Sequence, residues 1–152
     1  MPSHRILVAV CAAAAAIGAS STARAQTSRE IITSQLENAD RLAEMQGFRL
    51  DGRALSPSAL VGLLEADGQF IVEVELEASA EYLIEGFCDE DCTDIDLSLN
   101  APDGESVVSD VETDDVPELR FRASENGRYF LGVHLVDCST SRCYYAVRVL
   151  RK

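Results

Sequence analysis

The stretch Phe70-Ile71-Val72-Glu73-Val74-Glu75-Leu76 decides the fold class. Every even position in it is apolar, whereas Glu73 and Glu75 are charged, and this period of two is typical of a β-strand with one buried face. The pair Asp67-Gly68 precedes the stretch, and residues 60–65 form another apolar run before that pair. Two such runs joined at Asp-Gly predict a β-hairpin.

The same period continues to the C-terminus in short runs bounded by turn residues. The predicted strands are residues 60–65, 69–77, 81–86, 94–99, 105–109, 118–123, 128–136 and 144–150. About eight short strands at regular intervals favour an all-β fold, an antiparallel two-sheet sandwich of jelly-roll type. Its predicted core consists of Tyr82, Ile84, Ile95, Leu97, Leu119, Phe121, Tyr129, Leu131, Val133, Val147 and Val149.

An amphipathic helix is predicted ahead of the strands, over residues 28–46. Thr27-Ser28-Arg29-Glu30 matches a capping box, and Gly47 is placed to end the helix. Apolar side chains recur mostly at helical spacing, at Ile32, Leu36, Ala39, Leu42, Ala43 and Met45. Two interpretations follow: this stripe packs on the chain's own β-domain, or it docks onto a partner.

Residues 1–25 have the pattern of a cleaved signal peptide. Arg5 gives a basic start, an apolar stretch follows, and Ala23-Arg24-Ala25 supplies the small residues that a signal peptidase accepts. Lipidation at Cys11 is the alternative, although Val10 stands where a lipobox has a small residue. We therefore expect a leader over 1–25, a helix and linker over 26–58, and a β-sandwich over 59–152, in the periplasm or secreted.

Charge and length exclude several partner classes. The chain has 152 residues and a formal net charge of −13, which allows one small domain with an acidic surface. Such a surface repels phosphates, so we expect neither nucleic acid nor an anionic membrane surface as a partner. No apolar stretch beyond the leader is long enough for membrane insertion after cleavage.

Four cysteines remain after the leader: Cys88, Cys92, Cys138 and Cys143. An even number in an exported chain predicts two disulfides, and the close spacing favours Cys88 with Cys92 and Cys138 with Cys143. A single zinc ion held by all four is the alternative, although neither spacing is the common C-x2-C.

Several of these segments occur in a familiar order. They are Glu81-Tyr82-Leu83-Ile84, Asp94-Ile95-Asp96-Leu97, Pro102-Asp103-Gly104, Asn126-Gly127-Arg128-Tyr129-Phe130-Leu131-Gly132-Val133 and a closing Tyr-rich strand. Over roughly residues 60–150 the chain resembles the bacterial pre-peptidase C-terminal domain, here as a stand-alone exported variant. The resemblance implies a compact β-sandwich of jelly-roll type. Domains of that family accompany secreted hydrolases as non-catalytic modules, which implies binding to substrate, surface polymer or calcium.

Carboxylates crowd the segment around the first cysteine pair. Asp89, Asp91, Asp94 and Asp96 could converge on calcium, which accepts six to eight oxygen ligands in flexible geometry. The alternative is that Asp94 and Asp96 bind turn backbone while the others serve solubility. Calcium is the only cofactor that the sequence suggests.

Enzyme motifs are absent from the sequence: it has no G-x-S-x-G, no H-E-x-x-H and no glycine-rich phosphate loop. We expect His134 to be an exposed strand residue, and we expect no catalytic residues. The leading hypothesis is an exported non-catalytic module that binds an envelope protein or surface polysaccharide. The alternative is a structural or assembly protein of the envelope, docked through the helix, and a small hydrolase is the third possibility.

Overall fold

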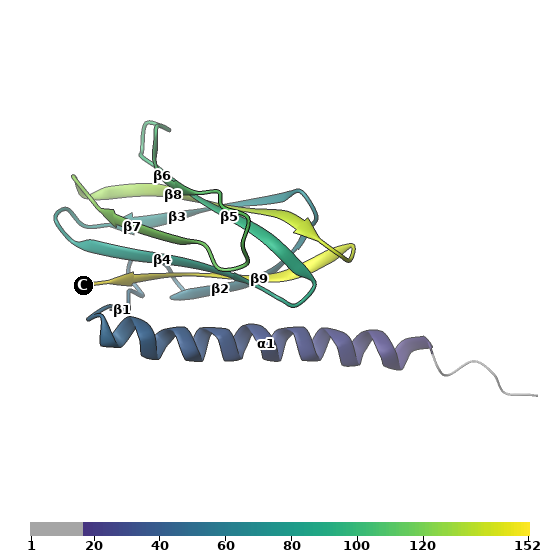
Figure 1. Cartoon of the computed structure of the whole chain (residues 1–152). Helices are drawn as coiled ribbons and strands as arrows, with labels where there is room; N and C mark the ends of the chain where they lie inside the picture. The colour runs from purple at the N-terminus through teal and green to yellow at the C-terminus, as the bar shows by residue number, and fades with distance from the viewer. Residues whose placement is uncertain (1–16) are drawn as a thin grey trace, which may run out of the picture.

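The computed structural model describes residues 17–152 of the chain, as one helix followed by nine strands (Figure 1). In chain order the elements are α1 (Ile17–Met45), β1 (Arg49–Leu50), β2 (Ala59–Glu65), β3 (Gly68–Leu76), β4 (Glu81–Cys88), β5 (Cys92–Asn100), β6 (Ser106–Asp110), β7 (Glu118–Arg122), β8 (Gly127–Cys138) and β9 (Arg142–Arg151). All eight predicted strands are confirmed. The short strand β1 was not predicted, because two residues carry no detectable period.

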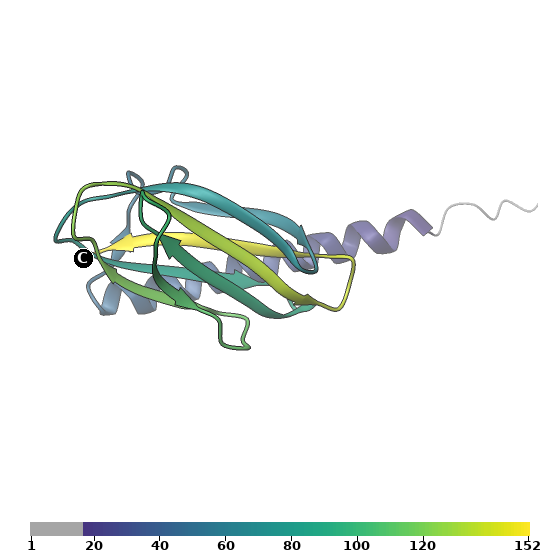
Figure 2. The same ribbon diagram turned by 90° about the horizontal axis from the view of Figure 1, so that it is seen from above.

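The strands form two antiparallel sheets that pack face to face. One sheet has the order β1-β9-β4-β7, with β2 also paired to β9, and we call it the covered sheet because α1 lies along its outer side (Figure 1). The other has the order β3-β8-β5-β6, and we call it the open sheet. Seen from above, α1 runs beneath the strands and extends past their end (Figure 2). The predicted two-sheet sandwich is therefore confirmed.

The space between the sheets holds the predicted core. Ten of the eleven predicted core residues are buried, and Phe121 is partly buried with its ring edge-on to Tyr129 at 5.4 Å between centroids. The alternation of apolar and polar residues places these side chains inward from both sheets, as in other β-sandwiches. The period of two therefore located the core correctly.

The covered sheet is buried on its outer side as well. Strands β4 and β9 are buried at nearly every position, because α1 covers the second face. Two apolar clusters form the contact: Ile32, Leu36, Ala39, Phe87, Tyr144 and Ala146 in one, and Ala43, Phe48, Leu83 and Leu150 in the other. The interpretation that the helix packs on its own domain is confirmed.

Parts of the helix prediction were wrong. Leu42 and Met45 are 56% and 77% exposed, because they lie off the stripe that faces the sheet. Tyr144, next to the buried Tyr145 on β9, is itself partly buried beneath the helix. Within the described residues the helix already extends upstream of Ser28, to Ile17, through an alanine-containing stretch.

The leader prediction falls largely outside the described residues, which begin at residue 17. The helix α1 crosses the predicted cleavage point after Ala25, so the helix of the uncleaved chain is longer than that of the expected mature chain. In the part of the chain that the structure describes, no helix combines the length and the apolar character that a membrane span requires.

Candidate functional site

Both predicted disulfides are present at one end of the sandwich. Cys88 bonds to Cys92 and Cys138 to Cys143, with Cα atoms 5.8 and 6.0 Å apart. Cys92 and Cys138 are also opposite each other in the ladder between β5 and β8, so the two closed loops lie side by side. The four cysteines are oxidised in pairs, which excludes their acting together as zinc thiolates.

The Asp89 side chain is part of the framework of these loops. It is buried, and its carboxylate accepts hydrogen bonds from the backbone N–H groups of Tyr144, at 2.8 Å, and Asp91, at 3.2 Å. Burial raises the pKa of the Asp89 carboxyl, and these two hydrogen bonds act in the opposite direction. Asp89 therefore joins the β4–β5 turn to the start of β9.

The side chains of the other predicted calcium ligands make different contacts. Asp91 accepts a hydrogen bond from the Ser139 hydroxyl at 3.4 Å, while Asp94 and Asp96 lie on β5 at alternate positions. Burial raises the pKa of Asp94, and the nearby carboxylates of Asp96, Asp114 and Asp137 raise it further. Among the described residues, no group of three or more His, Cys, Asp or Glu has a geometry that could hold a metal ion.

A buried ion cluster joins α1 to the covered sheet. Arg148 on β9 is fully buried, and it pairs with Glu85 on β4 at 2.6 Å and with Asp40 on α1. Its guanidinium also lies 5.4 Å from the centroid of the Phe87 ring. Burial raises the pKa of Glu85, and the charge of Arg148 opposes that rise. The cluster fixes the position of the helix, and no sequence motif pointed to it.

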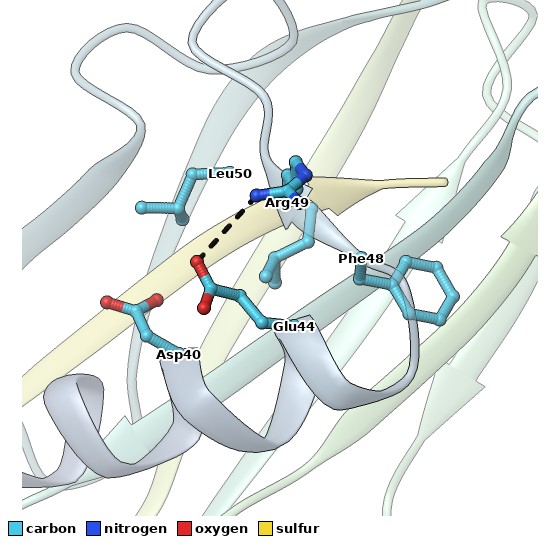
Figure 3. A pocket seen from close by; sticks show the side chains of 6 residues that line it. Asp40, Glu44, Phe48, Arg49 and Leu50 are labelled. Carbon is cyan, nitrogen blue, oxygen red and sulfur yellow. Dashed lines mark ion pairs between the residues drawn. The ribbon is translucent and has the colours of Figure 1, made fainter.

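A small pocket lies beside this cluster, at the C-terminal end of α1 (Figure 3). It holds about 150 Å³ and is lined by Asp40, Glu44, Phe48, Arg49, Leu50 and Leu150. The Glu44 carboxylate points toward the Arg49 guanidinium, with 3.9 Å between the charged atoms (Figure 3). An exposed pair at that distance contributes little to stability.

A larger hollow lies on the outer face of the open sheet, and we call it the outer groove. It has a volume of about 300 Å³ and is lined by Gln69, Phe70, Ile71, Asp96, Leu97, Ser98, Asn100, Val111, Gly132, Val133 and His134. Ile71 and Val111 are 64% and 68% exposed, respectively. The outer groove thus combines exposed aliphatic side chains with a carboxylate, two amides, a hydroxyl and an imidazole.

The cross-strand register explains how these residues meet. Gly132 on β8 is opposite Ile71 on β3 and Ser98 on β5, and His134 is opposite Gln69 and Asp96. A Cβ atom at Gly132 would lie 2.6 Å from the Ser98 hydroxyl oxygen. Gly132 therefore adds no side chain to the middle of the outer face, and the Ser98 hydroxyl lies over it; we call this position the notch.

His134 is on the outer face of β8, but it is half-buried and not exposed as predicted, with 29% of its side chain accessible, and it lies between two carboxylates. Its Nε2 atom is 2.9 Å from Asp67 and its Nδ1 atom is 3.5 Å from Asp96. The second distance exceeds that of an ordinary N–H···O hydrogen bond, so the Asp96 carboxylate is only weakly engaged by the ring. The sequence analysis placed Asp96 among possible calcium ligands and did not connect it to His134.

The outer groove was missed because its parts are distant in the chain. The outward positions of β8 could be recognised from their period, with Gly132 standing between Phe130 and His134. Strand order and register were not available from a single sequence, however, and these bring β3 and β5 to either side of Gly132.

Comparisons with known proteins support the fold. No family model and no curated protein matches the sequence. One similar solved structure is the pre-peptidase C-terminal domain of collagenase from Bacillus anthracis, with 17% identity, a TM-score of 0.50, and coverage of 60% of this chain and 86% of that chain. Another is PliG from Aeromonas hydrophila, a periplasmic inhibitor of g-type lysozyme, with 10% identity, a TM-score of 0.47, and coverage of 62% and 84%. At these identities the likeness concerns architecture: the chain has the β-sandwich fold of a pre-peptidase C-terminal domain.

Proposed function

We propose that this protein is an exported, non-catalytic module that binds a protein partner through the outer groove. The observation that carries the proposal is the difference between the two sheets. The helix covers the outer side of one sheet, whereas the other presents a groove of about 300 Å³ with two well-exposed aliphatic side chains. Exposed apolar side chains within a polar rim are typical of protein interaction sites.

Export is supported by the leader pattern of residues 1–25 and by the two disulfides, which persist in oxidising compartments such as the periplasm or the extracellular medium. Absence of catalysis is proposed on the chemistry of His134. Both of its ring nitrogens face carboxylates, Asp67 and Asp96, so the imidazole is oriented by two acids rather than directed at a nucleophile.

A protein partner is favoured over a surface polysaccharide by the lining of the outer groove. Sugar rings bind well against large aromatic faces, and the chain has no Trp. Apart from the His134 imidazole, Phe70 supplies the only aromatic ring in this lining, and that ring packs against the core. The alternative of an envelope protein docked through α1 needs an apolar helix face, but that face is already packed on the covered sheet.

Calcium remains a prediction for the disulfide loops. It is tested by the melting temperature of the purified protein in excess chelator and then across a calcium titration at constant ionic strength. Specific binding raises the melting temperature in a saturable way, and the rise should disappear in Asp94→Asn. A melting temperature that does not change with calcium contradicts the prediction without affecting the outer groove.

The binding proposal is tested by site-directed photo-crosslinking in the cells that make the protein. A photoreactive amino acid at Ile71 should give an adduct with one partner protein, identified by mass spectrometry. The matched control places the same group at Glu37, which is exposed on α1. Filling the notch with Ser98→Ala and Gly132→Val should remove the Ile71 adduct. The proposal would be overturned if Ile71 and Glu37 gave equal amounts of adduct. It would also be overturned if the Ile71 adduct still formed in the variant with Ser98→Ala and Gly132→Val.

A further inference from the structure

We propose that the outer groove receives an arginine side chain presented by a basic partner protein, with Asp96 as the residue that binds its guanidinium group. This inference rests on the proposed function and adds the chemistry of the partner. It is carried by the shape of the notch at Gly132, by the charge of the lining and by the incomplete engagement of Asp96.

The outer groove has a volume of about 300 Å³, which is room for a side chain, and Gly132 belongs to its lining. Phe130 and His134 are the outward neighbours of Gly132 along β8, each about 7 Å from it on the same face of the strand. Across the strands, Ile71 and Ser98 are the paired neighbours of Gly132. Gly132 adds no side chain and the small Ser98 hydroxyl lies over it, so this part of the outer groove suits a narrow, extended side chain better than a ring or a branched one.

The charge of the lining selects a cation. Asp96 is the only carboxylate among the residues that line the outer groove, and no Lys or Arg belongs to that set. Asp67, which is 90% exposed, adds a second negative charge at the rim through its contact with His134. Because the whole chain carries a formal net charge of −13, long-range attraction also favours a basic partner.

Asp96 retains the capacity to accept hydrogen bonds. The nearest charged atom that pairs with it among the described residues is His134 Nδ1, and the distance of 3.5 Å is longer than an ordinary N–H···O hydrogen bond. Charge-assisted hydrogen bonds from a guanidinium would be shorter and stronger than this contact. An incoming cation thus satisfies a carboxylate that the folded chain leaves poorly paired.

Arginine fits better than the other basic side chain because the polar acceptors are spread out. Asp96, Ser98 and Asn100 occupy successive outward positions of β5, so a planar group with several N–H donors can reach more than one of them. The exposed methyl groups of Ile71 and Val111 supply an apolar surface for the methylene stem. A lysine ammonium offers a single point of contact.

The test uses the purified, isotopically labelled protein and N-acetyl-arginine-N-methylamide as the probe, with backbone amide shifts read by NMR. The citrulline analogue is the matched probe, since it has nearly the same shape and no charge. We expect saturable shifts centred on Ile71, Ser98 and Gly132, and at least tenfold weaker binding of the citrulline analogue. Equal binding of both probes, or shifts that do not saturate, would overturn the inference.

Variants separate a specific contact from general attraction. Asp96→Asn should weaken the arginine probe about tenfold, whereas Glu73→Gln, which removes a charge from the same face outside the outer groove, should change its affinity less than twofold. Ser98→Ala with Gly132→Val should abolish binding, and an unchanged spectrum elsewhere shows that this variant folds. Equal weakening by Asp96→Asn and Glu73→Gln would contradict the assignment to Asp96.

The two proposals fail in different ways. If the Ile71 adduct forms and the arginine probe does not bind, the outer groove is a docking surface for another kind of side chain. If the probe binds and no adduct forms in cells, the arginine site exists without the proposed partner function.

Discussion

At the scale of single residues, Arg148 is the side chain whose environment is least expected from the sequence. It is fully buried between α1 and the covered sheet, and it is compensated by Glu85 and Asp40. A buried charge is tolerated only with partners, and removing one partner leaves the others uncompensated. Any other position of α1 would separate Arg148 from Asp40, which raises the free energy of the folded state. The cluster therefore favours the one observed position of the helix.

We expect Arg148→Ala to lower the free energy of unfolding by about 3–5 kcal/mol, because it leaves the buried Glu85 and the partly exposed Asp40 without their cation. The double change Glu85→Leu with Arg148→Met should recover most of that loss, since apolar side chains of similar volume need no partners. Urea unfolding followed by circular dichroism gives both values. Arg142→Ala, on the exposed start of the same strand, serves as the control, and a loss of the same size there would contradict the assignment.

Asp89 makes stability depend on pH. Burial raises its pKa in the folded state, so the folded chain holds the proton more tightly than the unfolded chain. Asp89 therefore contributes most to stability at pH values below the ordinary pKa of a carboxyl group. This contribution is lost as the pH rises through the pKa that Asp89 has in the folded state. We expect the free energy of unfolding of the wild type, measured relative to that of Asp89→Asn, to fall between about pH 3 and about pH 6. A constant difference across that interval would show that Asp89 does not titrate differently on folding.

At the scale of secondary structure, the sequence predicted the eight longer strands because alternation is a local signal that needs no knowledge of neighbours. It predicted one buried face for each strand, which holds for β3 and β8. It failed for β4 and β9, where Leu83, Phe87 and Leu150 were not recognised as buried. Their burial depends on where α1 docks, and that placement is a tertiary property.

Substitutions in α1 test whether the helix is held by the face that packs on the covered sheet. Ile32 is buried against Phe87 and Ala146, and Ile32→Ala should cost about 2–4 kcal/mol in unfolding free energy because it leaves a cavity under the helix. Met45→Ala on the exposed side of the same helix should change stability by less than about 0.5 kcal/mol. Thermal unfolding of both variants decides the point, and equal effects would mean that the helix is not held by this face.

At the scale of the whole molecule, charge is unevenly placed. The disulfide end carries Asp89, Glu90, Asp91, Asp94 and Asp137. Both views place the β8–β9 turn, with the second disulfide, at the end of the sandwich away from the C-terminus (Figure 1, Figure 2). Near the C-terminus, a hollow of about 400 Å³ is lined by Arg49, Arg53, Arg151 and Lys152 together with Gly47, Leu50 and Asp51. A basic partner is therefore attracted mainly to one end.

This asymmetry predicts salt-dependent association. The rate at which the crosslinked partner binds the purified protein should fall at least tenfold between about 50 mM and 500 mM salt, because screening removes the steering field. Stopped-flow fluorescence measures that rate directly. A rate independent of salt would mean that the acidic surface serves solubility and not recognition.

The acidic composition and the sandwich could both be predicted from the sequence, but the outer groove could not. Its lining residues come from β3, β5 and β8 and from Val111 beyond β6, and it exists only once the strand order is known. The calcium prediction stays untested. The structure places Asp94 and Asp96 on the same face of β5, and the Asp89 carboxylate accepts a hydrogen bond from the backbone of Tyr144.

The position of β9 has a consequence for the order of events during synthesis. This last strand is the shared neighbour of β1, β2 and β4, and it also carries Arg148 and half of the surface on which α1 rests. As the ribosome releases the chain from its N-terminal end, the earlier strands of the covered sheet wait for a neighbour that emerges last. The covered sheet thus cannot close before β9 has been synthesised, so β1, β2 and β4 remain without their common neighbour until then.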